Sequence, residues 1–296
     1  MIIMVAAPAP GSSESNLALA PRVRLAHACI ARHLEDAGLR GLHLKGYAAA
    51  PGTYAAGRSG SDVDLLVHPE DADHACTVLQ ARGWSRVTDF SEGSIFEHAA
   101  TLWLDHLGYV DVHRLFPGLG SDPAAVFDHL WRERSARVIS GRPVPVPSLD
   151  GQRLAVIVHA ARDGGRGRPD VRHLQDTLSP DEWERLRSLA ATLDAEAAWD
   201  VATGEDLAPG GTAESELFTA LRSHASGADL LAARWRAAGT VRERAGLVAR
   251  VVPVNRAHLQ MRLGRPVTWR DVVREQASRV GAGLTWIARK AVRRGR

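Results

Sequence analysis

The sequence predicts an α+β domain followed by a helical domain. In the first half, short apolar runs with the alternating pattern of β-strands stand between segments with the apolar spacing of helices. From Ser148 onward, nearly every segment has the spacing of a helix. We therefore expect a flexible N-terminal tail over residues 1–20, an α+β domain over 21–147 and a helical domain over 148–296.

The α+β half is expected to begin with a helix over 21–38. Pro21 suits a first helical turn, the apolar residues fall near one face, and Gly38 stops the helix. A second helix is expected to follow Pro69, with acidic residues in its first turn. The segments with strand patterns are 42–46, 62–68, 84–90, 94–104, 108–116 and a strand pair or extended arm within 136–147.

The helical half has one clear helix start. Ser179 stands at the N-cap position, Pro180 at the first helical position and Glu182 at the third, which together form a capping box. We expect "DGGRGRPD", residues 163–170, to be a flexible connection between helices. The expected helices are 148–164, 179–193, 213–225, 227–238, 240–251 and 268–293.

The composition is that of a soluble globular protein, with 45% apolar and 24% charged residues. No apolar run is long enough to span a membrane. The short apolar start "MIIMVAAPAP" lacks the basic region of a signal peptide. We therefore expect a cytoplasmic protein whose cysteines, Cys29 and Cys76, are free buried thiols.

The basic character of the chain is concentrated at its C-terminal end. The last eight residues, "RKAVRRGR", carry five positive charges, so the formal net charge of +3 becomes −2 for residues 1–288. Nucleic acid is therefore an unfavourable partner. The basic end suits a weak contact with anionic surfaces. The alternative is an ordinary last helix whose cations complement its dipole.

Two aspartates lie on one predicted strand, in "RSGSDVDLLV". Asp62 and Asp64 share one face, about 6.6–6.8 Å apart, while Val63 and Leu65 take the other face. Two like charges this close repel, and Mg²⁺ would relieve the repulsion because it prefers carboxylate oxygens. The alternative is a half-exposed strand whose carboxylates face water.

A third aspartate occurs in the later strand "GYVDVHRLF". Asp111 would bring its carboxylate to the same end of the sheet, and three carboxylates can hold two metal ions about 3.5–4 Å apart. His113 shares the face of Asp111, where it either contacts a substrate or is simply packed or solvated. Lys45 is one of only two lysines among 37 Lys plus Arg, which draws attention to its compact ammonium.

Together these segments resemble a known family. "HLKG", "RSGSDVDLLV" and "VDVHRLF", in this order, resemble the bacterial uncharacterised nucleotidyltransferase family of the DNA polymerase beta-like nucleotidyltransferase superfamily. The resemblance covers roughly residues 22–176 and includes, more weakly, "LAVIVHAARDGG…RHLQD". It implies a nucleotidyltransferase-like mixed sheet with flanking helices, followed by a helical domain.

The resemblance also implies roles for individual residues. Asp62, Asp64 and Asp111 are expected to be catalytic and to bind two Mg²⁺ ions, with Mn²⁺ as the alternative metal. Asp111 is expected to help activate the acceptor hydroxyl as well. The residues expected to bind the nucleotide are Lys45, Gly46, Arg58, Ser61 and His113. The turn at Gly46 would present backbone N–H groups to phosphates, and Arg58 would hold a phosphate oxygen bidentately.

The implied activity is transfer of a nucleoside monophosphate from an NTP, such as ATP, to a hydroxyl-bearing acceptor, with release of pyrophosphate. The acceptor would be a small molecule, a peptide or a protein. The superfamily usually has Ser or Gly where this chain has Tyr47, so a phosphate-binding Ser is missing unless Ser59 or Ser61 replaces it. This departure motivates the alternative, a non-catalytic module that binds a nucleotide or a partner on a degenerate nucleotidyltransferase fold.

Overall fold

The computed structural model describes most of the chain up to residue 238 and selected positions beyond it. The described residues are 17–55, 57, 60–90, 98–120, 122–205, 213–223, 227–238, 240, 241, 244, 254, 259, 267–278 and 281. The expected N-terminal tail over 1–20 falls largely outside these residues, as do Arg58, Ser59 and most of the helices expected over 240–251 and 268–293. Residues 269–278 are helical, in agreement with the last of these expectations.

The centre of the fold is a five-stranded mixed sheet with the strand order β1-β2-β5-β4-β3. Strands β2 and β5 are parallel, and the other neighbouring pairs are antiparallel. The predicted mixed sheet is therefore confirmed. The strands are β1 (Gly41–Leu44), β2 (Asp62–Val67), β3 (Ser85–Thr88), β4 (Ala99–Leu104) and β5 (Gly108–His113).

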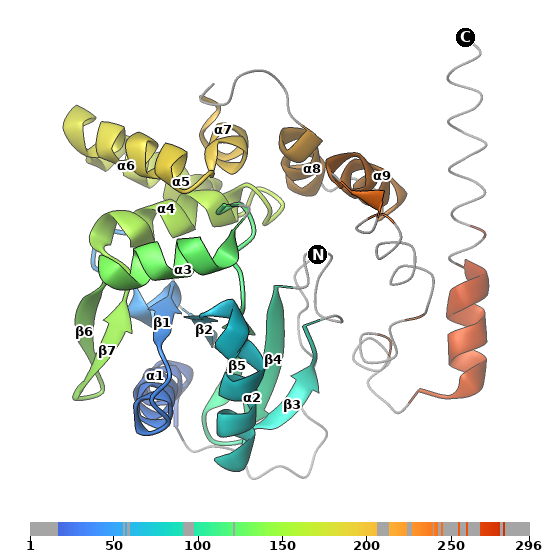
Figure 1. The fold of residues 1–296 in the computed structure, drawn as a ribbon, viewed down its shortest axis with the longest axis horizontal. Helices are drawn as coiled ribbons and strands as arrows, with labels where there is room; N and C mark the ends of the chain where they lie inside the picture. Colours follow the sequence, from blue (N-terminus) through green and yellow to red (C-terminus); the bar gives the residue numbers. More distant parts are fainter. Residues whose placement is uncertain are drawn as a thin grey trace.

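Helices flank the sheet and make up nearly all of the described chain after residue 147. Figure 1 shows the strands of the sheet between α1 at one end and the group of α3 to α7 at the other. The α-helices are α1 (Leu19–Asp36), α2 (Ala72–Ala81), α3 (Pro123–Arg132), α4 (Leu149–Ala160), α5 (Arg168–Thr177), α6 (Pro180–Thr192), α7 (Glu196–Thr203), α8 (Ala213–Arg222) and α9 (Gly227–Ala237). Two short 3₁₀ helices, η1 (Gly46–Ala48) and η2 (Pro69–Asp71), follow β1 and β2.

The two faces of the sheet pack differently. On one face, Val63 and Leu65 of β2 and Val110 of β5 are buried against α1 and α2. On the other face, Leu44 and Leu66 join a second core formed largely by α3 to α8. Because this second core includes both the sheet and the later helices, the helical half packs directly on the sheet. The division of the chain at residues 147 and 148 stays a prediction.

The local signals in the sequence have mixed outcomes. Ser179 and Glu182 form the predicted capping box at the start of α6. The segment 136–147 is part of an antiparallel hairpin of β6 (Ser135–Ile139) and β7 (Arg142–Val146), turning at Ser140 and Gly141 with positive φ angles. Helix α3 was not expected, although Asp122 caps it through bonds from two backbone N–H groups.

Among the described residues, no helix is long and apolar enough to cross a membrane.

Gly118, which follows β5, packs closely against the later helices. Its φ angle is +93°, and a Cβ placed on it would lie 2.6 Å from Val158 Cγ1 and 2.9 Å from Ala198 Cβ. Positive φ disfavours any side chain, and the close atoms leave no room for one. The segment that leaves β5 can therefore pack against α4 and α7 only through a glycine.

We predict that Gly118→Ala lowers the free energy of unfolding by about 2–4 kcal/mol, through backbone strain together with overpacking. Gly141→Ala is the matched control, because Gly141 has a φ of +79° but nothing within 4 Å of an added Cβ. That variant should lose only about 1 kcal/mol, from strain alone. Urea denaturation of both variants measures the difference, and equal losses would contradict the packing argument.

Candidate active site

The predicted carboxylates meet on the face of the sheet opposite α1 and α2. In the parallel pair, Asp62 is opposite Tyr109 and Asp64 is opposite Asp111. Thr101 of β4 lies on the other side of Asp111. Since side chains alternate between the faces of a strand, these residues share one face while the valines and leucines between them pack beneath. The sheet thus brings together the three aspartates that the sequence singled out.

Asp64 is the most heavily bonded of the three aspartates. Its Oδ1 atom lies 2.9 Å from Lys45 Nζ and 2.9 Å from His113 Nε2. The side chains of Lys45 and Asp64 are each 13% exposed, and that of His113 is 3% exposed. Burial lowers the pKa of His113, against its bond to Asp64, so the ring is neutral at neutral pH and its Nε2–H donates to the carboxylate.

The three carboxyl groups have different proton affinities. Burial acts to raise the pKa of Asp64, but the Lys45 ammonium and the His113 hydrogen bond outweigh it and hold that pKa well below its ordinary value. Burial and then the Asp64 charge raise the pKa of Asp111 to about 7, against the 2.6 Å hydrogen bond from Thr101 Oγ1. Burial and the Asp64 charge also raise the pKa of Asp62. Asp64 is thus ionised at neutral pH, while Asp111 can hold or release a proton there.

The predicted phosphate turn lies beside the start of β2. Lys45 and Gly46 both have positive φ angles, 52° and 50°. A Cβ on Gly60 would come within 3.2 Å of Gly46 Cα, so the two glycine backbones touch. The Ser61 hydroxyl, which was predicted to bind the nucleotide, donates a hydrogen bond to Asp62 Oδ1 at 3.1 Å. Tyr47, which replaces the usual Ser, packs beside the α1–α2 core, with the Arg24 guanidinium 5.1 Å from its ring centroid.

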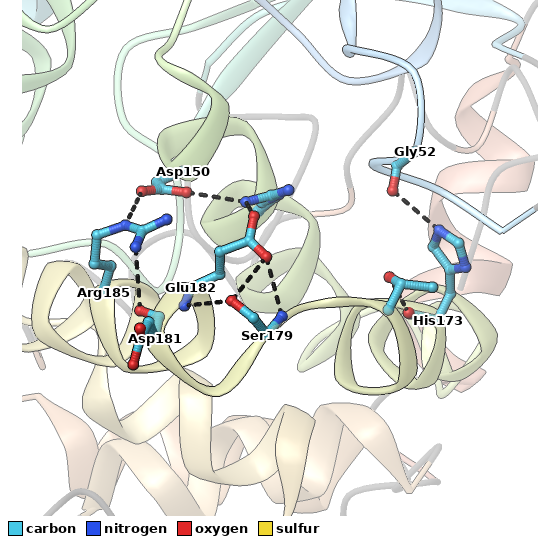
Figure 2. Close-up of polar contacts among 9 residues, drawn as sticks. Gly52, Asp150, His173, Ser179, Asp181, Glu182 and Arg185 are labelled. Carbon is cyan, nitrogen blue, oxygen red and sulfur yellow. Dashed lines mark hydrogen bonds and ion pairs between the residues drawn. The ribbon is translucent and has the colours of Figure 1, made fainter.

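The loop from η1 towards β2 is held by the helical half. Ala50 N donates to Gln152 Oε1 of α4 at 2.7 Å, and Ala55 N donates to Asp170 Oδ1 of α5 at 3.3 Å. His173 Nε2 of α5 donates to the Gly52 carbonyl at 3.0 Å, as Figure 2 shows. The same view shows α4 joined to α6 through Asp150, Arg185 and Glu182. Residues 50–55 are therefore anchored to α4 and α5.

Sequence reasoning missed several polar residues at the site. Arg162, in the turn after α4, lies with its Nη1 atom 3.4 Å from His98 Nε2 and its Cζ atom 5.2 Å from the Phe116 ring centroid. Lys45 Nζ lies 5.7 Å from the same centroid. The His98 ring in turn lies beside that of His113 in a tilted arrangement, with ring centroids 5.2 Å apart. The only sequence signal for Arg162 is its position at the end of an apolar helix. The residues that it contacts come from distant segments of the chain, so local patterns do not indicate these contacts.

The donor atoms fit a divalent metal ion. In the described part of the chain, Asp64, Asp111 and His113 each offer a ligand atom within 4.8 Å of the others. Carboxylate oxygens suit Mg²⁺ or Mn²⁺, and the raised pKa of Asp111 shows that this buried group lacks compensating positive charge. His113 donates to Asp64 through the same Nε2 atom that would ligate the metal. His113 therefore fits better as the group that orients the Asp64 carboxylate. The aspartates fit better as the metal ligands.

The mixed sheet with paired carboxylates on its two central parallel strands defines a nucleotidyltransferase fold. A family model described as "uncharacterised nucleotidyltransferase" matches residues 12–203. The chain belongs to this uncharacterised nucleotidyltransferase family, as its motifs indicated. The matched region includes the whole sheet and α4 to α7.

Solved structures similar to the chain are also nucleotidyltransferases or resemble them. They include the lincosamide antibiotic adenylyltransferase LnuA with lincomycin bound, at 16% identity, a TM-score of 0.35, and coverage of 52% of this chain and 96% of that one. The antibiotic-resistance factor ANT(2'')-Ia has 13% identity, a TM-score of 0.39, and coverage of 58% and 91%. A nucleotidyltransferase-like antigen of Paracoccidioides brasiliensis has 16% identity, a TM-score of 0.37, and coverage of 61% and 93%. The comparison with curated proteins gave no match.

We predict that Thr101→Val raises the titration midpoint of Asp111 further, by about 0.5–1 in pH, because the variant loses a hydrogen bond that stabilises the carboxylate. Carbon-13 chemical shifts of labelled aspartate carboxyl groups, followed against pH in EDTA, measure the midpoint. Thr77→Val is the control, because the Thr77 hydroxyl bonds to the Asp73 carbonyl on exposed α2. An Asp111 midpoint that stays at its wild-type pH in Thr101→Val would contradict the assignment.

Proposed function

We propose that the protein is a Mg²⁺-dependent nucleotidyltransferase. It transfers a nucleoside monophosphate from an NTP to a hydroxyl group of a small molecule, a peptide or a protein, with release of pyrophosphate. The observation that supports this most strongly is the register of β2 and β5, which sets Asp64 opposite Asp111 on the polar face. A cytoplasmic location, where NTPs are abundant, is part of the same proposal.

The aspartates have separate tasks in this proposal. Asp62, Asp64 and Asp111 hold the metal, with Lys45 and His113 fixing the Asp64 carboxylate in place. When bound, the divalent ions offset the negative charge of the triphosphate. The carboxylate of Asp111 accepts the proton of the acceptor hydroxyl. The hydroxyl oxygen bonds to the α-phosphorus as the bond to pyrophosphate breaks.

The two substrates approach from opposite sides of the carboxylates. Lys45, at the end of β1, lies on one side of β2 and is suited to phosphate. On the other side, Tyr109 of β5 and Trp103 of β4 form an aromatic pair with ring centroids 4.3 Å apart. Tyr109 is opposite Asp62 and two residues before Asp111, on the same face. The acceptor therefore enters over the aromatic pair, and the triphosphate lies towards β1.

One observation favours a second candidate function. Tyr47 stands where the wider superfamily usually has Ser or Gly, and its ring packs towards Arg24 and the core. Weak phosphate binding would leave a non-catalytic module that binds a nucleotide or a partner. This module would bind nucleotides without needing the metal, which separates it from the leading proposal.

Calorimetric titration with non-hydrolysable analogues of the NTPs, in Mg²⁺ and then in EDTA, tests the proposal. Binding that requires Mg²⁺ supports the transferase and identifies the donor. Binding that is equal in EDTA supports the non-catalytic module. Failure of every analogue to bind would remove the proposed donor site.

We predict that Asp64→Asn lowers the affinity for the Mg²⁺–NTP complex at least about tenfold, because the variant loses a charged metal ligand. Its thermal stability should change little, since relief of repulsion with Asp62 and Asp111 offsets the loss of the Lys45 ion pair. Asp176→Asn, at an exposed position of α5, is the control and should bind like the wild type. Wild-type Mg²⁺–NTP affinity in a folded Asp64→Asn variant would exclude Asp64 as a ligand.

A further inference from the structure

The turn between α4 and α5 brings a guanidinium group to the carboxylate site. Arg162 follows directly on the last residues of α4, a helix whose apolar side chains are buried in the core of the helical half. The turn is closely packed, since a Cβ on Gly167 would come within 2.6 Å of Ala160 Cβ. The segment expected as a flexible connection is thus an ordered turn that fixes the position of Arg162.

The positive charge of Arg162 is not neutralised by an ion pair. No carboxylate among the described residues forms a salt bridge with it, and its Nε atom is buried without a hydrogen-bond partner there. The contacts that it does make are with neutral rings, those of His98 and Phe116. Burial lowers its pKa to about 10, although Asp64, Asp163 and Asp111 act to raise it, so the group stays charged at neutral pH.

Arg162 and Lys45 lie close to the same aromatic ring. The Arg162 Cζ atom is 5.2 Å from the Phe116 ring centroid and the Lys45 Nζ atom is 5.7 Å from it. One cation comes from the sheet and the other from the helical half. An anion that reached both groups beside this ring would be attracted by both charges. A planar guanidinium with free N–H groups can hold a phosphate group through two parallel hydrogen bonds.

We propose that Arg162 binds the pyrophosphate portion of the NTP, together with Lys45, so that the helical half supplies one of the cations that hold the leaving group. This inference rests on the proposed nucleotidyl transfer and adds a residue to it. Arg162 donates N–H groups to the two terminal phosphates in the bound NTP. It stabilises the charge that collects on the leaving pyrophosphate when its bond to the α-phosphorus breaks. The helical half thereby takes part in donor binding.

Inorganic pyrophosphate is a suitable probe, because it is common to every NTP and makes the identity of the base irrelevant. Its affinity in Mg²⁺ is measured by calorimetry for the wild type and for Arg162→Gln, Arg162→Lys and Arg172→Gln. Arg172 is an exposed arginine of α5, so its replacement removes the same charge from the same hairpin away from the site. Thermal unfolding of each variant shows whether it is folded.

Arg162→Gln should weaken pyrophosphate binding about tenfold or more, and Arg172→Gln should leave it unchanged. Arg162→Lys keeps the charge but loses the planar fork, and its affinity should lie between those of the wild type and Arg162→Gln. If Arg162→Lys and any folded Arg162→Gln bind pyrophosphate with wild-type affinity, the assignment of Arg162 is overturned. The proposed nucleotidyl transfer would not be affected by that result. If the wild type itself binds neither pyrophosphate nor any NTP, the proposed function fails, and this inference fails with it.

Discussion

The repulsion between Asp64 and Asp111 is the constraint on which the arrangement of the site depends. Directly opposed side chains of neighbouring strands lie about 5 Å apart, where two full charges repel by about 3 kcal/mol at an effective dielectric constant of 20. Strands β2 and β5 nevertheless pair at this register. The reason lies on the opposite face, where side chains such as Val63, Leu65 and Val112 are fully buried and each contribute about 1.5–3 kcal/mol.

The same constraint explains how the polar neighbours are distributed. Lys45 and His113 both contact one oxygen of Asp64, whereas Asp111 receives only the Thr101 hydroxyl. The groups that stabilise a negative charge are therefore concentrated on Asp64, whose carboxyl group stays ionised. Asp111 becomes the group that holds a proton near neutral pH. Two identical side chains in opposed positions acquire different proton affinities because only Asp64 forms an ion pair with Lys45.

Much of the five-stranded sheet could be predicted from local patterns. The alternation of Val63 and Leu65 with Asp62 and Asp64 was enough to predict β2, and the same period predicted β5. That the two strands are parallel neighbours could not be read from alternation, which indicated only that Asp111 lies towards the same end of the sheet. Helix α3 was missed although Asp122 and the Pro after it are an ordinary helix start.

Arg162 was beyond prediction for a different reason. It falls at the end of the helix expected over 148–164, and no local pattern shows that this end reaches the carboxylates. Its place at the site follows from the packing of α4 against the sheet, which depends on contacts such as those of Gly118 with Val158 and Ala198. Such contacts join residues far apart in the chain and leave no periodic signal in either segment. The position of Arg162 is therefore determined by tertiary packing.

The hydrogen bonds of the η1–β2 loop extend this dependence to residues 50–55. The loop begins at Gly46 and returns to Gly60, whose backbone touches it, so its two ends are fixed by the sheet. Its middle is held by bonds from Ala50 and Ala55 to side chains of α4 and α5, and from His173 to Gly52. The α4–α5 hairpin thus anchors the loop and carries Arg162. A shift of this hairpin would move the loop and Arg162 together relative to Asp64. The geometry of the site is therefore set jointly by the sheet and the helical half.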